Sequence, residues 1–125
     1  MTTDVQKVNI AEKLGTFDDL WHPKVVAELN GQWVKVVKLE GEYVWHAHEA
    51  EDEMFYVVSG HVDIHLRHKV VGLDPGELLV VPRGVEHKPV AQTLAHVLLF
   101  EPATTRSTGD VDEPRTVEAH EVERI

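Results

Sequence analysis

Residues 41–60 read GEYVWHAHEAEDEMFYVVSG, and this stretch decides the fold. His46 and His48 lie two positions apart in a segment with the composition of a β-strand, so both imidazoles are expected on one face. A short acidic loop follows, and Glu53 is in phase with the apolar residues of the next strand. If the loop reverses the chain, Glu53 begins a strand beside the two histidines. The alternative is that Glu53 is one more solvated charge.

A second turn supplies a fourth candidate side chain. Pro82 ends an apolar segment, Gly84 permits a tight turn, and His87 opens the returning segment. Imidazole nitrogens together with a carboxylate suit divalent first-row metals. The alternative interpretation of His87 is a core histidine that is satisfied by hydrogen bonds.

The rest of the chain has the pattern of an all-β domain. Residues 24–29 and 32–40 flank Asn30-Gly31, a pair typical of a type I′ hairpin turn. Further strands are expected at 42–48, 54–59, 61–67, 70–74, 77–82, 86–91 and 95–101. Many short strands without a long helical period indicate a sandwich or a barrel, and closure removes the sheet edges. Residues 11–22 predict only one short helical turn.

Length and charge restrict the class of protein. The chain has 125 residues, which suits one domain, and no cysteine, which excludes disulfides and thiolate chemistry. A net charge of −10 repels phosphate backbones and anionic headgroups, so we expect neither a nucleic-acid nor a membrane partner. We see no signal peptide and no apolar run of about 18 residues, and we expect a cytoplasmic protein.

The C-terminal residues differ from the strand-rich part. After residue 101 the apolar alternation stops and acidic residues outnumber basic ones, which predicts an extended or partly disordered tail. A final strand near Thr116-Val117 that pairs with a partner subunit is the alternative. The expected organisation is an N-terminal arm at 1–23, a barrel at 24–101 and an acidic tail at 102–125.

The two motifs resemble those of the cupin superfamily, a group of small metal-binding barrels. The first family motif is Gly, five residues, His-x-His, three or four residues, Glu, six residues, Gly. Residues 41–60 match it with one residue fewer in the first gap. The second motif is Gly, five residues, Pro-x-Gly, two residues, His, three residues, Asn. GELLVVPRGVEHKPVA at 76–91 matches it except that Ala91 replaces the asparagine, and the short spacing between motifs is similar to that of single-domain bacterial cupins.

The resemblance implies a cupin jelly-roll β-barrel that binds one divalent ion. The implied ligands are His46, His48, Glu53 and His87. Such a set suits Fe, Mn, Ni, Zn or Cu, and in an octahedral shell it leaves two positions for a small-molecule substrate, water or dioxygen. The resemblance further implies a metal-dependent oxygenase, isomerase or lyase acting on a small oxygen-rich molecule. The alternative is a non-catalytic module that binds a small molecule or sugar, with a metal in the barrel.

Two further residues are candidates for catalysis. His96 shares a face with Leu98 and Phe100, and it is either a core residue or an acid–base group that lines the pocket. Arg83 lies in the turn before His87, where it is either solvated or holds an anionic group of the substrate.

We also expect a homodimer. The resemblance suggests it, because cupin barrels often pair through their outer sheets and exchange N-terminal strands. Trp45 and Tyr56 are out of phase with the implied ligands and are expected to face away from them. Trp45 would pack on the outer layer of the barrel or at a dimer contact, and Tyr56 against a second sheet or a partner subunit. The partly apolar residues 5–10 could add a strand to the neighbour's sheet, and two-fold pairing is the commonest closed assembly.

Overall fold

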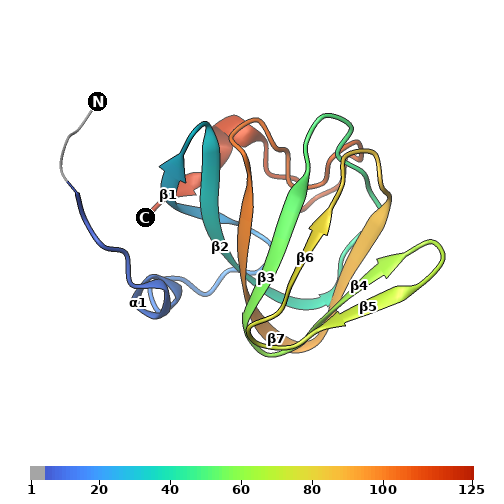
Figure 1. Cartoon of the computed structure of the whole chain (residues 1–125), viewed down its shortest axis with the longest axis horizontal. Coiled ribbons are helices and arrows are strands. Elements are labelled where there is room, and N and C mark those ends of the chain that lie inside the picture. Colours follow the sequence, from blue (N-terminus) through green and yellow to red (C-terminus); the bar gives the residue numbers. More distant parts are fainter. Residues whose placement is uncertain (1–4) are drawn as a thin grey trace.

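The computed structural model describes residues 5–125, and β-strands dominate it (Figure 1). The strands are β1 (Lys24–Leu29), β2 (Gln32–Glu42), β3 (Glu53–Ser59), β4 (Val62–Leu66), β5 (Val70–Leu73), β6 (Leu78–Val81), β7 (His87–Pro102) and β8 (Glu123–Arg124). The helical elements are the short α1 (Ile10–Leu14) and the 3-10 turn η1 (Ala119–Glu121). Within the described residues, no helix is long and apolar enough to cross a membrane. The all-β prediction is confirmed.

Strand β7 connects the two ends of the sheet. Its first part pairs with β4, and its second part lies between β2 and β3 in antiparallel register. Strand β1 extends the sheet from β2, β6 extends it from β3, and β5 extends it from β4. The sequence predicted two strands at 86–91 and 95–101, whereas one long strand runs through both. Residues 92–94 between them are exposed, and there the buried alternation is interrupted.

The predicted hairpin turn between β1 and β2 is confirmed. Asn30 has φ of 53° and Gly31 has φ of 77°, so both central residues adopt the left-handed conformation that a type I′ turn requires. The predicted strand at 42–48 is wrong for most of its length. After Glu42 the chain leaves the ladder, and only His46 keeps a bridge, which pairs it with His87.

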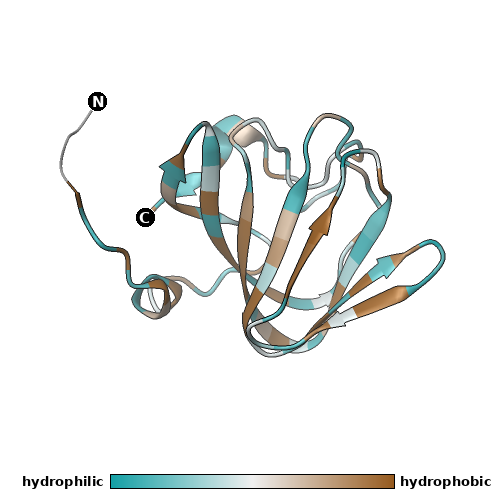
Figure 2. Ribbon diagram, in the orientation of Figure 1, coloured by the Kyte–Doolittle hydropathy of each residue, from teal (hydrophilic) through white to brown (hydrophobic). Residues whose placement is uncertain are grey.

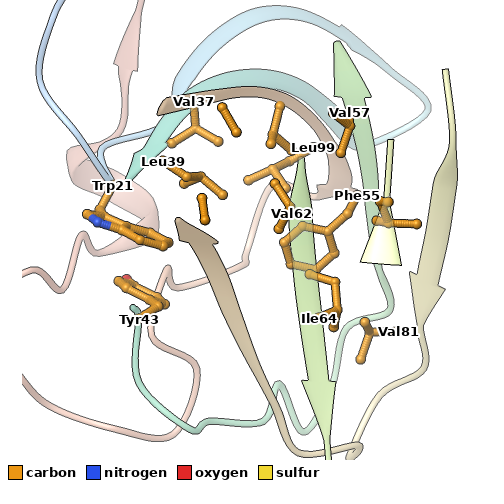
Figure 3. Packing of buried hydrophobic residues seen from close by; sticks show 14 residues of the cluster. Trp21, Val37, Leu39, Tyr43, Phe55, Val57, Val62, Ile64, Val81 and Leu99 are labelled. Atoms are coloured by element: carbon orange, nitrogen blue, oxygen red, sulfur yellow. The ribbon is translucent and has the colours of Figure 1, made fainter. Parts of the chain in front are cut away.

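The core lies between the curled strands, and alternate side chains fill it. Val37 and Leu39 from β2 meet Phe55 from β3 and Leu99 from β7 within one buried cluster (Figure 3). The stacked rings of Trp21 and Tyr43 lie at one end of this cluster (Figure 3). Trp21 belongs to the N-terminal arm, which therefore contributes to the core.

Apolar side chains remain exposed on the outer face of β6. Leu78 is 55% exposed and Val80 is 50% exposed, and β6, largely brown in Figure 2, pairs only with β3. Trp45 is half-buried, and the Arg67 guanidinium lies over its ring at 3.9 Å. Residues 5–9 form no strand. The homodimer stays a prediction, and the molar mass in solution decides it.

The C-terminal residues pack against the barrel, which corrects the expectation of a loose tail. Thr105, Thr108 and Val117 are buried. The Arg106 guanidinium donates hydrogen bonds to the carbonyls of Gly109 and Val111 at 2.9 and 3.0 Å. The final strand, β8, pairs in parallel with β1 of the same chain rather than lying near Thr116-Val117. Composition predicted disorder because residue counts reveal neither the local hydrogen bonds of Arg106 nor the long-range pairing of β8 with β1.

The tail also forms hydrogen bonds with Ala47, the residue between His46 and His48. The Ala47 N–H donates to Asp110 Oδ1 at 2.9 Å, and the Asp110 N–H donates to the Ala47 carbonyl at 3.0 Å. Gly109 has φ of 54°, and a Cβ at this position would lie 2.2 Å from the Ala47 carbonyl oxygen. Real Cβ atoms do not approach so closely, so only glycine fits here.

The close contact between Gly109 and Ala47 predicts a large loss of stability in Gly109→Ala. Gly31→Ala is the matched control, because Gly31 also has a positive φ but no atom within 4 Å of its Cβ position. We expect the control to lower the free energy of unfolding by about 1–2 kcal/mol, the left-handed penalty alone. Gly109→Ala should lose at least about 2 kcal/mol more, measured by urea denaturation. An equal loss of unfolding free energy in the two variants would contradict a stabilising contact between Gly109 and Ala47.

Candidate metal centre

The four side chains implied as ligands lie together inside the barrel. His46 and His48 come from the irregular segment after β2, Glu53 begins β3, and His87 begins β7. Each offers one ligand atom, and these atoms all lie within 4.8 Å of one another. All four side chains are buried, with exposed fractions of 5% or less. The sequence prediction that these residues form one cluster is confirmed.

A backbone bridge fixes two of the imidazoles. The His87 N–H donates to the His46 carbonyl at 2.9 Å, and the His46 N–H donates to the His87 carbonyl at 3.1 Å. In each ring Nδ1 lies 2.9 Å from a carbonyl two residues earlier, that of Val44 or of Val85. An Nδ1–H that donates to these carbonyls leaves the Nε2 lone pair free to bind an ion, as in metal-ligating histidines.

His48 carries the observation that most favours an ion. Its side chain is buried, and neither ring nitrogen has a hydrogen-bond partner among the described residues. Its Nε2 lies 3.4 Å from Glu53 Oε1, on the side of the cluster. A buried polar atom without a partner costs about 1–3 kcal/mol, and a cation bound between Nε2 and the carboxylate would remove that cost. The donor set therefore fits a divalent ion.

The charges in the cluster are distributed unequally. Burial, reinforced by nearby His87, lowers the pKa of His46 to about 4, so this ring is neutral at pH 7. Burial also opposes the charged form of His48, but the nearby Glu53 carboxylate outweighs it and raises the pKa of His48. Burial alone would raise the pKa of Glu53, yet the neighbouring Glu101, His48 and His87 side chains hold it well below its usual value. Glu53 is thus a buried anion.

A buried contact between Lys35 and Glu101, which sequence reasoning missed, lies beside this anion. Lys35 Nζ lies 2.9 Å from Glu101 Oε1, and both side chains are 2% exposed. Burial and the neighbouring Glu53 carboxylate raise the pKa of Glu101 well above its usual range. The alternation of buried and exposed residues along the strand could have revealed this burial, because Glu101 is in phase with the buried Leu99 on β7.

His96, predicted to be a core or pocket residue, does not join the cluster. His96 shares a face of β7 with Leu98 and Phe100, as predicted. That face points outward, because the odd-numbered residues of β7 fill the interior. His96 is half-buried on that outer face, paired in register with Lys38 of β2 and Ser59 of β3. Burial and the charge of Lys38 lower its pKa.

Arg83 also lies apart from the cluster. Its backbone N–H donates to Asp52 Oδ1 at 2.8 Å, and its Nε lies 3.4 Å from the same oxygen. Both side chains are more than half exposed. This contact ties the turn before His87 to the acidic loop before Glu53, which helps to explain why the two ligands meet.

A cavity of about 40 Å³ adjoins the cluster. His46 and Glu53 form one side of it, and the other lining residues come from strands β2, β3 and β7, from the arm and from the tail. The lining residues are Trp21, Pro23, Val37, Leu39, Tyr43, His46, Glu53, Phe55, Pro89, Leu99, Glu101 and Ser107. A small molecule in this cavity would therefore touch both an ion and an apolar wall.

Comparisons with known proteins agree with this geometry. Among solved structures, a cupin-2 domain containing protein from Shewanella frigidimarina is 42% identical with a TM-score of 0.75, over 76% of this chain and 93% of that one. Protein NMB1881 from Neisseria meningitidis is 26% identical with a TM-score of 0.72, over 78% of this chain and 99% of that one.

Sequence comparison gives the same result. YdbB from Bacillus subtilis is 33% identical over 64 residues, which are 50% of this chain and 57% of YdbB. The chain thus spans little more than half the length of that curated relative. The family model of the cupin domain matches residues 32–101, more than half of the chain. With the fold and the cluster in agreement, the chain belongs to the cupin family and has its jelly-roll architecture.

Proposed function

We propose that this cupin is a metal-dependent enzyme that binds one divalent ion through its three histidines and Glu53. The buried, unpartnered imidazole of His48 carries the proposal. Three neutral imidazoles and one carboxylate favour Fe, Mn, Ni, Zn or Cu over Ca or Mg, which prefer oxygen ligands. Among these metals, the arrangement alone does not select one.

The reaction class follows from the ligand count and the adjoining cavity. Four protein ligands leave two positions of an octahedral shell for a small molecule and for water or dioxygen. A bound ion would supply Lewis-acid polarisation of a substrate oxygen. The protein's own part is to orient the molecule: Tyr43 and Phe55 flank the cavity, while the buried setting excludes most water. We infer an oxygenase, isomerase or lyase that acts on a small molecule with oxygen donors.

A non-catalytic binding module is the second candidate, and one observation favours it. Outside the ligand set, the acid–base groups that line the cavity are Glu101 and Tyr43. Glu101 is engaged with Lys35, and burial raises the pKa of Tyr43 to about 12, which makes it a weak acid. His96, the expected acid–base group, faces the other side of β7.

The cytoplasmic location stays a prediction.

Turnover separates the two candidates. We expect the purified chain, loaded in turn with each of the five metals, to consume oxygen or isomerise or cleave a member of a panel of short diketones, catechols, hydroxyketones and thiols. Oxygen uptake and proton NMR of the mixtures detect these reactions, and His87→Ala should abolish them. Tight binding of panel members without any turnover would favour the binding module instead.

Metal affinity should depend on the Glu53 carboxylate. We expect Glu53→Gln to weaken binding at least about tenfold, because losing a ligand exceeds the usual effect of changes around the ligands. Glu49→Gln is the matched control, since Glu49 is an exposed acid of the neighbouring loop. Competition with a chelating dye measures both affinities. Equal affinities in the two variants would mean that Glu53 is not a ligand.

Acid should release the ion. A proton and the ion compete for each imidazole, and the raised pKa of His48 means that this ring is protonated first as the pH falls. The lowered pKa of His46, about 4, keeps that ring available until strongly acidic pH. We expect occupancy, measured by elemental analysis after gel filtration, to fall below about pH 6. Occupancy that stays constant to about pH 4 would argue against histidine ligation.

A further inference from the structure

The buried position of the four implied ligands means that an ion needs a route to them. Their exposed fractions are 5% or less, so an ion from solution must pass between other side chains before it meets any of the four. Two cavities border the set. The first adjoins His46 and Glu53, whereas a second one adjoins His48.

The second cavity, of about 240 Å³, lies between the acidic loop before β3 and the C-terminal tail. Four of its lining residues come from His48 and the loop that follows it, and the other four come from the tail. The lining residues are His48, Glu49, Ala50, Glu51, Thr104, Arg106, Gly109 and Asp110. Of the four implied ligands, only His48 belongs to this wall, so the second cavity meets the centre there.

The wall of the second cavity combines exposed and buried side chains. Glu49 and Asp110 are exposed, Glu51 is half-buried, and His48 is the one buried residue of the wall. Neither ring nitrogen of His48 has a hydrogen-bond partner among the described residues. The cavity therefore joins solvent to the implied ligand that most lacks a partner.

The carboxylates of this wall keep oxygen atoms that a cation could use. Thr104 Oγ1 donates to Glu51 Oε2 at 2.9 Å, and the Ala47 N–H donates to Asp110 Oδ1 at 2.9 Å. Each of these contacts occupies one carboxylate oxygen and leaves the other, and the exposed Glu49 lies on the same wall. A divalent ion that gives up hydrating water needs such oxygens in exchange.

The one cation of the wall is balanced by acids outside it. The Arg106 Nε donates to Glu118 Oε1 at 2.8 Å, and its Nη2 pairs with Asp112. Glu118 and Asp112 do not line the cavity. The positive charge of Arg106 is thus already matched, and the three carboxylates give the second cavity a negative wall.

The first cavity offers a cation less. Eight of its twelve lining residues are apolar or aromatic, and both of its carboxylates, Glu53 and Glu101, are buried. An ion that passes apolar side chains loses hydration without receiving oxygens in return, which is costly for a charge. The distribution of charge therefore favours the second cavity as the route.

We propose that the divalent ion enters and leaves through the second cavity, where Glu49, Glu51 and Asp110 bind it transiently before His48 does. This route rests on the proposed function, because the ion is the one that the three histidines and Glu53 would bind. The three carboxylates are outside the final site, since none belongs to the group whose ligand atoms lie within 4.8 Å of one another. Entry and exit share one transition state, so weakening the route slows both and leaves the affinity nearly unchanged.

Removing two carboxylates from the wall tests the route. We expect Glu49→Gln/Glu51→Gln to slow both association and dissociation of Mn²⁺ at least about threefold, with a dissociation constant within about twofold of wild type. The rates are measured at about 1 M salt, where a Debye length of about 3 Å screens the long-range field of the two charges. Stopped-flow tryptophan fluorescence reports binding without turnover, and excess chelator starts the dissociation. Trp21 serves as the probe because it stacks on Tyr43, whose ring centroid lies 5.5 Å from that of His46.

Glu12→Gln/Glu40→Gln is the matched control. It removes the same charge from two exposed acids that do not line the second cavity. We expect both rates to stay at the wild-type values. A difference between the two double variants then belongs to the cavity wall and not to the net charge of the chain.

A second pair of variants tests the route at one exposed position. Ala50 lines the second cavity and is exposed, so either substitution leaves the core intact. At low salt, where screening is weak, Ala50→Lys should slow association of Mn²⁺ at least about twofold relative to Ala50→Gln, because the added charge repels the ion. This comparison stands even if the double variant fails to fold.

The outcomes are separable. Unchanged rates at high salt in Glu49→Gln/Glu51→Gln overturn the route, because the acids would then act only as a distant field. A much weaker affinity with faster dissociation also overturns it, because the acids would then be ligands of the bound ion. In both cases the wild-type chain binds Mn²⁺ and the proposed metal centre stands. A wild-type chain that binds no divalent ion overturns the proposed function itself.

Discussion

The buried negative charge of Glu53 is the constraint on which the rest of the centre depends. A carboxylate that is 5% exposed is stable in a protein interior only when charges or hydrogen bonds surround it. His48 and His87 lie within 3.4 Å of its Oε1, and Glu101, itself held by Lys35, is a further neighbour. A divalent cation would complete this centre. It would bring positive charge to the Glu53 carboxylate, whereas neutral imidazoles bring little.

Part of the chain that carries the clustered histidines lies outside the sheet. Residues 43–48 leave the regular ladder, so their backbone groups need other partners. His87 pairs with His46, the Gly84 N–H donates to the His48 carbonyl, and Asp110 takes both groups of Ala47. The tail therefore has a structural role. It supplies hydrogen bonds to backbone groups that have no partner in the sheet.

Local signals in the sequence predicted much of the fold and the ligand cluster, and long-range contacts account for what was missed. Asn30-Gly31 predicted its turn because both residues tolerate positive φ, and the resemblance of the two motifs to the cupin pattern predicted the four side chains that cluster. The placement of the tail could not be predicted, because its contacts with Ala47 join residues 63 positions apart. The Lys35–Glu101 pair spans 66 positions, and each partner alone reads as an ordinary charged residue.

The ligand set and the cavity wall come from different parts of the chain. The cupin match covers residues 32–101, which contain all four implied ligands. Trp21 precedes that region, whereas Ser107 and the Arg115 that covers Tyr43 follow it. The arm and the tail thus contribute to the cavity wall, while the family-matched region contains the four clustered side chains. Trp21 holds its place through contacts that involve none of these four residues.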